Sequence, residues 1–166
     1  KYALWEKIPA SIRDRLRDGL EGKVEETHKH DDPVFTHVTM LLVATISQAL
    51  EAAAAKAEQL GYKTRILCAD MTGEARERAT ELVRTAEQCA ASLKPGDRPV
   101  CLLAGGETTV SLKGNGLGGR NQEMALAATL LLAGNEQISM VCVGTDGTDG
   151  PTDAAGGFAD GTGVDK

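Results

Sequence analysis

Apolar residues along this chain form two kinds of pattern, stripes with helical spacing and short continuous runs, and the two kinds alternate. Ile12, Leu16 and Leu20 recur four residues apart, as one face of a helix requires. The short runs are rich in β-branched residues, as buried strands are. In order, residues 1–92 are predicted to contain a helix in two pieces over 2–22, a polar connector over 21–33, a strand over 38–45, a helix over 47–60, a strand over 64–69 and a helix over 73–92 capped by Thr72.

The second part of the chain continues this alternation, with one short connection. An apolar strand is predicted over 100–104, and residues 108–112 alternate in a way that suits a hairpin arm around Gly105 and Gly106. A helix over 121–133 is apolar nearly all round, so we expect it to be covered on both sides. A buried strand over 138–143 follows. These elements predict an α/β fold with three α/β/α layers and a mixed, largely parallel sheet.

Composition narrows the class of protein. The 166 residues suffice for one domain with a real core, and we expect a helical segment with a polar connector over 1–36 and an α/β domain over 37–166. A net charge of -6 argues against a nucleic-acid or anionic-membrane partner, and no apolar stretch is long enough to span a bilayer. Four cysteines without a CxxC pair suit the reducing cytoplasm. An oligomer is compatible with these properties.

Glycine-rich segments with charged and hydroxyl side chains gather after residue 104. Each follows an apolar run, where a strand or helix would end and a loop would face solvent or a ligand. Tight turns alone would not need Glu107, Arg120 and several aspartates beside the glycines. The three segments are Gly105-Gly106-Glu107-Thr108-Thr109, residues 114–123 and residues 145–153.

The middle segment leads directly into the predicted helix at Arg120. Free N–H groups at a helix start, the positive end of the helix dipole and a guanidinium together make a site for an anion, above all a phosphate. An ion pair of Arg120 with Glu107 or Glu123 is the alternative interpretation. The candidate phosphate-binding residues of this segment are Gly116, Gly118, Gly119, Arg120 and Asn121.

The same loop matches the GxGxxG pattern through Gly114, Gly116 and Gly119. It lies between a predicted strand and a predicted helix, which is the context that a dinucleotide-binding fold requires. The match alone is weak, and Arg120 is unusual where such folds pack their helix tightly. A Walker A sequence is absent, because no Gly-Lys-Ser/Thr occurs in the chain. A bound nucleotide would therefore need another cradle.

Asp146, Asp149 and Asp153 follow a predicted buried strand, on a loop with two Asp-Gly pairs. Carboxylates at the carboxyl edge of a strand can bind one or two Mg²⁺ ions together with water and phosphate oxygens. Alternatively, one of these carboxylates can act as a base on a hydroxyl. Glu107 and the two threonines after it add acceptors and hydroxyls. Asp-Gly is also an ordinary turn pair, and a helix cap at Thr152 or Asp153 is the alternative.

These motifs resemble the glycerate 2-kinase family with its MOFRL-type C-terminal domain, here residues 99–166. The resemblance runs in order through residues 105–109, 118–123 and 145–156, and Gly73-Glu74-Ala75 resembles the segment before that domain. It implies ATP-dependent phosphorylation of D-glycerate to 2-phosphoglycerate, with Arg120 as the catalytic arginine. It also implies a cleft shared with an N-terminal Rossmann-like domain, so we expect this chain to be an inactive fragment of a two-domain protein.

The resulting hypothesis is a kinase that uses ATP and Mg²⁺. Arg120 and Asp146 are the expected catalytic residues, and Asp146, Asp149 and Asp153 are the expected metal ligands. The expected substrate- or phosphate-binding residues are Gly105, Gly106, Glu107, Thr108, Thr109, Gly116, Gly118, Gly119, Asn121 and Thr152. Two alternatives stay open: an NAD(P)H-dependent hydroxypyruvate reductase, an activity described for other members of the resembled family, and a non-catalytic regulatory domain.

Overall fold

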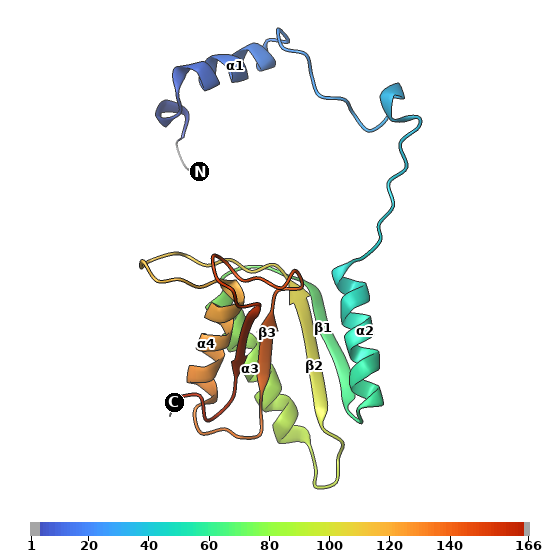
Figure 1. Cartoon of the computed structure of the whole chain (residues 1–166), viewed down its shortest axis with the longest axis vertical. Helices are drawn as coiled ribbons and strands as arrows, with labels where there is room; N and C mark the ends of the chain where they lie inside the picture. The colour runs from blue at the N-terminus through green and yellow to red at the C-terminus, as the bar shows by residue number, and fades with distance from the viewer. Residues whose placement is uncertain (1–3, 165–166) are drawn as a thin grey trace. The chain divides into compact units, whose positions relative to one another are not determined.

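The structure is a computed structural model that describes residues 4–164, and its contacts divide the chain into two units, Lys1–Leu42 and Val43–Lys166 (Figure 1). The first unit contains η1 (Trp5–Lys7), α1 (Ala10–Leu20) and η2 (Pro33–Phe35), with the polar connector between α1 and η2. The predicted two-piece helix is confirmed over these residues, and its start at residue 2 lies outside the described part. The apolar stripe of α1 is exposed within this unit, since Ile12 and Leu16 are 49% and 50% accessible.

The predicted strand over 38–45 is wrong. These residues form no regular element and pair with no strand in the described part of the chain. Met40 and Val43 are 90% and 81% exposed. A β-branched apolar run favours an extended backbone, but a strand forms only where a neighbour supplies the ladder hydrogen bonds.

The second unit begins with an α-β-α-β series, as the sequence predicts. Its elements are α2 (Ile46–Gln59), β1 (Lys63–Met71), α3 (Ala75–Ser92) and β2 (Val100–Gly106), and β1 pairs with β2 in parallel. Thr45 caps α2 by accepting a hydrogen bond from the Gln48 amide at 3.2 Å. The predicted cap of α3 by Thr72 is wrong, because that helix begins at Ala75 and Glu74 is its N-cap residue.

The rest of the second unit comprises α4 (Arg120–Leu132), β3 (Met140–Val143) and β4 (Gly156–Ala159). β3 and β4 pair antiparallel, and the sequence analysis did not predict β4. The hairpin arm expected over 108–112 is wrong, because past Gly106 the chain follows the segment before α3 and makes one parallel bridge, Thr109 to Glu74. The α/β fold is confirmed, and it contains both parallel and antiparallel pairing. Among the described residues these are two separate two-stranded sheets.

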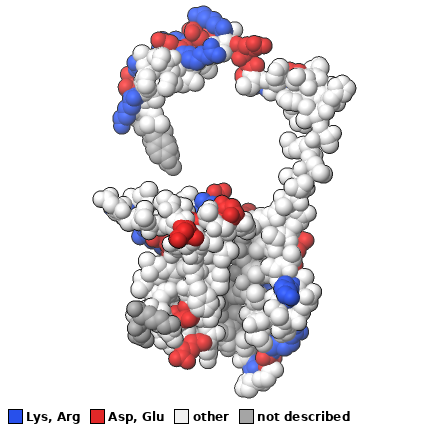
Figure 2. All heavy atoms as spheres, viewed as in Figure 1, with Lys and Arg blue, Asp and Glu red and all other residues white. Residues whose placement is uncertain are grey.

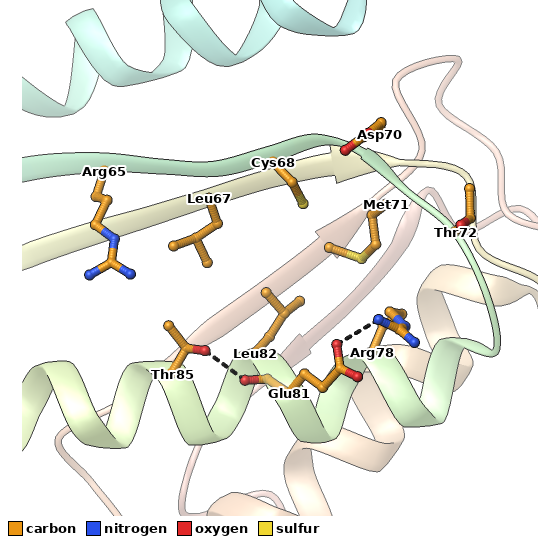
Figure 3. Close-up of a pocket in the computed structure, with 10 residues that line it drawn as sticks. All are labelled: Arg65, Leu67, Cys68, Asp70, Met71, Thr72, Arg78, Glu81, Leu82 and Thr85. Atoms are coloured by element: carbon orange, nitrogen blue, oxygen red, sulfur yellow. Dashed lines mark hydrogen bonds and ion pairs between the residues drawn. The ribbon is translucent and has the colours of Figure 1, made fainter.

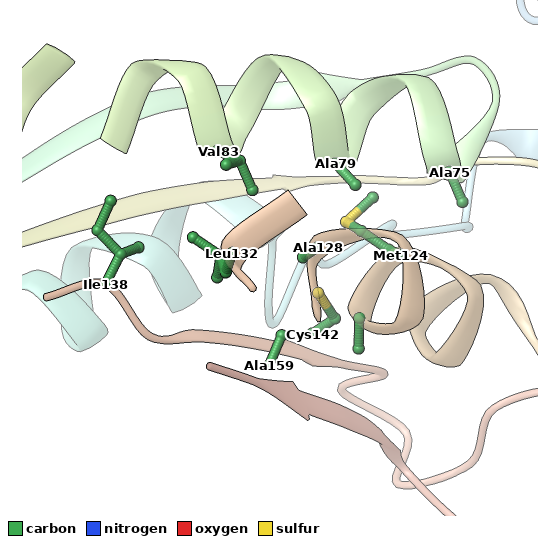
Figure 4. Packing of buried hydrophobic residues seen from close by; sticks show 10 residues of the cluster. Ala75, Ala79, Val83, Met124, Ala128, Leu132, Ile138, Cys142 and Ala159 are labelled. Atoms are coloured by element: carbon green, nitrogen blue, oxygen red, sulfur yellow. The ribbon is translucent and has the colours of Figure 1, made fainter. Parts of the chain in front are cut away.

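Helices cover the parallel strands on both faces. α2 packs on β1 and β2, and Figure 3 shows the two strands between α2 and α3. α4 packs on α3, β3 and β4, and the core lies among these elements (Figure 4). Leu126 and Leu130 on the outer side of α4 are 59% and 64% exposed, so the expectation that this helix is covered on both sides is wrong within this structure. The buried core residues are Ala75, Ala79, Val83, Met124, Ala125, Ala128, Leu132, Ile138, Cys142 and Ala159.

Candidate functional site

Loops that follow β2 and β3 surround a cavity of about 660 Å³. Figure 1 shows both loops at the end of the unit where β2 finishes. The volume falls within the range of roughly 300–1,000 Å³ that small-molecule sites occupy. Open α/β sheets bind ligands beyond the carboxyl ends of their strands, which is where this cavity lies. Its lining residues are Glu107, Thr108, Thr109, Val110, Leu112, Gly118, Gly119, Arg120, Asp146, Thr148, Asp149, Gly150 and Pro151.

Arg120 is the first residue of α4 and the cation of this lining. Its Nη1 lies 3.2 Å from Glu107 Oε1, and the two side chains are 47% and 76% exposed. The other carboxylate considered from the sequence, Glu123, pairs with Arg76 at 3.0 Å instead. An exposed ion pair contributes only about 0–1 kcal/mol, so an anionic ligand could displace Glu107 from the guanidinium at little cost. Arg120 is therefore placed to bind an anion in the cavity.

Asp149 occupies the start of α4, where the sequence analysis expected a phosphate. Its carboxylate accepts hydrogen bonds from the backbone amides of Asn121 at 3.0 Å and Gln122 at 2.8 Å. The side-chain amides of the same two residues add hydrogen bonds at 3.0 and 3.1 Å. Asp149 is 2% exposed, and it lies 28 residues along the chain from Asn121. It is a helix cap supplied from a distant loop.

This cap changes the electrostatics at the helix start. Burial alone would raise the pKa of Asp149, but the hydrogen bonds from Asn121 and Gln122 outweigh burial and hold the pKa below its ordinary value. The carboxylate stays ionised and balances the positive end of the helix dipole. The predicted phosphate cradle of free amides is thus corrected, because Asp149 already uses the Asn121 and Gln122 amides. Asn121 serves the cap and does not line the cavity.

The three aspartates do not form a common metal cage. Within residues 4–164, no group of three or more His, Cys, Asp or Glu side chains is close enough to hold an ion. Asp149 is committed to the helix start, and Asp153 is exposed and outside the cavity lining. Asp146 is exposed and lines the cavity, and its Oδ1 accepts a hydrogen bond of 3.3 Å from the Thr148 amide. Asp146 is the aspartate of the three that a cavity ligand could reach.

Several predicted ligand-binding glycines instead allow close packing. A Cβ on Gly105 would lie 2.6 Å from Ile46 Cγ1, so this glycine lets α2 approach the strand. Gly106 has φ +149° and passes directly over the Met71 backbone. A Cβ on Gly119 would lie 2.6 Å from Asp149 Oδ1, while Gly116 has open space. Gly105, Gly106 and Gly116 do not line the cavity, whereas Gly118 and Gly119 do.

Part of the apolar and hydroxyl wall was not among the predicted site residues. Val110 and Leu112 follow the 105–109 motif, and Thr148 and Pro151 lie within residues 145–153; only their position in or next to these motifs could have indicated that they line the cavity. Thr152, a predicted ligand-binding residue, lies outside the lining. Its hydroxyl donates to the Asp149 carbonyl at 2.8 Å and accepts from Gln122 Nε2 at 2.9 Å. Thr152 therefore supports the cap.

Charges of both signs lie near this end of the unit. Figure 2 shows acidic side chains on the loops beyond the strands, with few basic ones in that view.

A second cavity, about 460 Å³, lies between β1 and α3 and is lined by Arg65, Asp70, Arg78 and Glu81 among others (Figure 3). No residue predicted for the site lines that second cavity. No helix within residues 4–164 is both long enough and apolar enough to cross a membrane.

A cavity with an accessible arginine and carboxylate beyond parallel strands is typical of ligand sites in α/β proteins, and the chain is a protein of that class. Residues 100–166 match the MOFRL family. A glycerate 2-kinase of Pyrococcus horikoshii is 44% identical over 97% of this chain, and a D-glycerate 2-kinase of Thermotoga maritima is 39% identical over 84%. The chain belongs to the glycerate 2-kinase family.

Solved structures agree with this assignment. A crystal structure of a Pyrococcus horikoshii protein superimposes with a TM-score of 0.69 at 43% identity, over 99% of this chain and 37% of that one. A glycerate kinase structure from Thermotoga maritima gives 0.68 at 39% identity, over 75% of this chain and 30% of that one. The human glycerate kinase is 31% identical over 95% of this chain. The chain spans 36% and 32% of the length of the two prokaryotic kinases, about a third.

Proposed function

We propose that this chain forms part of the active site of an ATP-dependent kinase that converts D-glycerate to 2-phosphoglycerate. The observation that carries the proposal is the placement of Arg120 and Asp146 on one cavity with Glu107, Thr108 and Thr109. Phosphoryl transfer needs a cation for the phosphoryl oxygens and a carboxylate for the metal, and these residues supply both. Family membership supports the same chemistry. A Rossmann-like domain, expected from the resemblance, would complete the cleft.

Arg120 would bind the phosphoryl group as it moves from ATP to glycerate. A guanidinium can donate two parallel hydrogen bonds to phosphoryl oxygens and balance charge that spreads onto them in the transition state. In the transfer, the glycerate hydroxyl oxygen bonds to the terminal phosphorus, the bond from that phosphorus to the ADP oxygen breaks, and the hydroxyl proton passes to water. The Glu107 pair is weak enough to give way to the phosphoryl group.

Mg²⁺ fits this cavity only with a reduced set of protein ligands. Magnesium usually takes one or two carboxylates and completes its shell with water and phosphate oxygens. Asp146 is exposed at the cavity and suits that role, while the buried Asp149 carboxylate does not. Bound with ATP, the ion would neutralise phosphate charge beside Glu107 and Asp146. Asp153 has no place in this site as the structure arranges it.

The two alternative functions receive less support from the geometry. A dinucleotide-binding GxGxxG loop holds a pyrophosphate on the free amides of the following helix, and here Asp149 occupies those of Asn121 and Gln122. A regulatory domain would not need an accessible arginine and carboxylate on one cavity. ADP release with D-glycerate and ATP supports the kinase, and loss of nicotinamide absorbance with hydroxypyruvate supports the reductase. A regulatory domain gives neither signal.

Arg120→Ala tests the proposed role, in protein of the relatives' full length. Removal of one transition-state donor lowers kcat by about 100-fold or more. The melting temperature should hardly change, because only an exposed ion pair is lost. Arg76→Ala is a matched control, since Arg76 is also 47% exposed and in one ion pair but lies outside the cavity lining. Equal kcat values for the two variants would remove Arg120 from the mechanism.

A further inference from the structure

We propose that Glu74 is a positioning residue that holds the 107–112 wall of the cavity in place. This inference rests on the proposed function and goes beyond it, because Glu74 itself does not line the cavity. Glu74 belongs to the Gly73-Glu74-Ala75 motif, which has no role in the proposed mechanism. It is the N-cap residue of α3, and its side chain makes no cap hydrogen bond there. The carboxylate is directed to another partner.

The backbone ties the first half of the wall to the segment before α3. Past the strand ends, the Glu107 amide donates to the Met71 carbonyl at 2.8 Å, and the Thr109 amide donates to the Gly73 carbonyl at 2.8 Å. The Ala75 amide then donates to the Thr109 carbonyl at 2.9 Å. These bonds fix residues 107–109, but they reach no further along the chain.

The Glu74 carboxylate extends this attachment to residue 111. Its Oε1 accepts from the Ser111 hydroxyl at 2.7 Å, and its Oε2 accepts from the Ser111 amide at 3.2 Å. Ser111 lies between Val110 and Leu112, which both line the cavity. The hydrogen bonds from Ser111 hold the pKa of Glu74 below its ordinary value, with smaller contributions from Arg76 and Lys113. The acceptor is therefore ionised at neutral pH, and both bonds are charge-assisted.

Residues 112–117 have no comparable attachment within the described part of the chain. Residues 112–117 make no hydrogen bond to another residue of the 4–164 range, and Leu112 and Leu117 are 87% and 80% exposed. The next fixed point is Gly118-Gly119, which packs against Asp149 and Gly150. The Glu74–Ser111 contact is the last attachment before this loop, so it sets the direction in which the loop leaves the cavity wall.

The first test measures hydrogen exchange in the 166-residue chain. In Glu74→Ala, the Ser111 amide should exchange about tenfold faster, because its hydrogen bond to a charged acceptor is lost. Glu77→Ala is the matched control, because Glu77 lies in the first turn of the same helix and is exposed. Ser111→Ala removes only the hydroxyl bond and leaves the helix unaltered, so the amide of residue 111 should show a smaller change in the same direction; this variant serves if Glu74→Ala does not fold. Unchanged exchange in both Glu74→Ala and Ser111→Ala overturns the proposal.

The second test uses protein of the relatives' full length, with D-glycerate and MgATP. A positioning role predicts about a tenfold rise in KM with a smaller change in kcat, since Glu74 touches no reacting atom. Glu74→Gln keeps one acceptor oxygen and should recover part of the loss. The double variant with Ser111→Ala should be no worse than Glu74→Ala alone. Kinetics equal to those of Glu77→Ala overturn the positioning role. A wild-type protein without glycerate phosphorylation refutes the proposed function, while the exchange test of the Glu74 attachment still stands.

Discussion

Replacing Asp149 with alanine should strongly lower the free energy of unfolding, because this residue caps α4. A metal ligand, the role expected from the sequence, would not have this effect in the absence of metal. Loss of a helix N-cap costs about 0.5–2 kcal/mol, and loss of a hydrogen bond to a charged group costs about 1.5–3 kcal/mol. Two backbone and two side-chain amides of Asn121 and Gln122 lose this acceptor in a site that is 2% exposed. Because such terms are not additive, we expect the free energy of unfolding to fall by about 3–4 kcal/mol.

Urea denaturation of the 166-residue chain measures this effect. Asp153→Ala is the control, because it removes the same charge from an exposed position and should change stability by about 0.5 kcal/mol or less. Asp149→Asn keeps one acceptor oxygen, so its free energy of unfolding should lie between those of Asp149→Ala and Asp153→Ala. If Asp149 were instead a metal ligand, its alanine variant would match Asp153→Ala without Mg²⁺ and lose only the stabilisation that added Mg²⁺ gives. That result would refute the helix-cap reasoning.

The pH dependence of unfolding gives a second measure of the same residue. The folded pKa of Asp149 is lowered, so its contribution is fully present above the unfolded pKa, about 3.9, and is lost as pH falls through the folded pKa. Wild-type protein should therefore lose stability on acidification below about pH 4 more steeply than Asp149→Asn. Parallel pH profiles for the two proteins would show that this carboxylate carries no linked proton.

Two further predictions concern packing around the same loops. Gly119→Ala should lower the free energy of unfolding by about 1–3 kcal/mol, since the added Cβ would meet the Asp149 carboxylate. In Gly114→Ala the added Cβ meets nothing within 4 Å, so the melting temperature should be unchanged. Burial, with the nearby charge of Asp149, raises the pKa of the Cys142 thiol to about 11. In native protein at pH 8, a thiol reagent should therefore modify Cys142 only at the rate of unfolding, and rapid modification, located by mass spectrometry, would contradict its burial.

Local patterns predicted the helices well because each helix carries its own periodicity. In the predicted helix over 73–92, Ala75, Ala79 and Val83 recur four residues apart, and all three are at most 3% exposed. Strands were harder, because pairing depends on residues elsewhere in the chain. The run over 38–45 has strand composition without a described partner, while β4 begins with two glycines and forms against β3.

The candidate site shows the same distinction between local and distant information. The motifs placed Arg120, Asp146 and Glu107 in one region, and the structure puts them on one cavity. No pattern in the sequence indicated that Asp149 would cap α4, because its partners lie 27 and 28 residues earlier and no local spacing connects them. Glycines were ambiguous for a related reason, since close packing of elements and ligand approach favour the same residue.

The distant cap of α4 also limits how the chain can be divided. A protein cut between α4 and β3 would separate the helix from the carboxylate that completes its first turn, so neither piece should regain native structure alone. During synthesis, α4 would become fully stable only after the turn that follows β3 has been made. The two pieces, mixed, should complement each other only when that aspartate is retained.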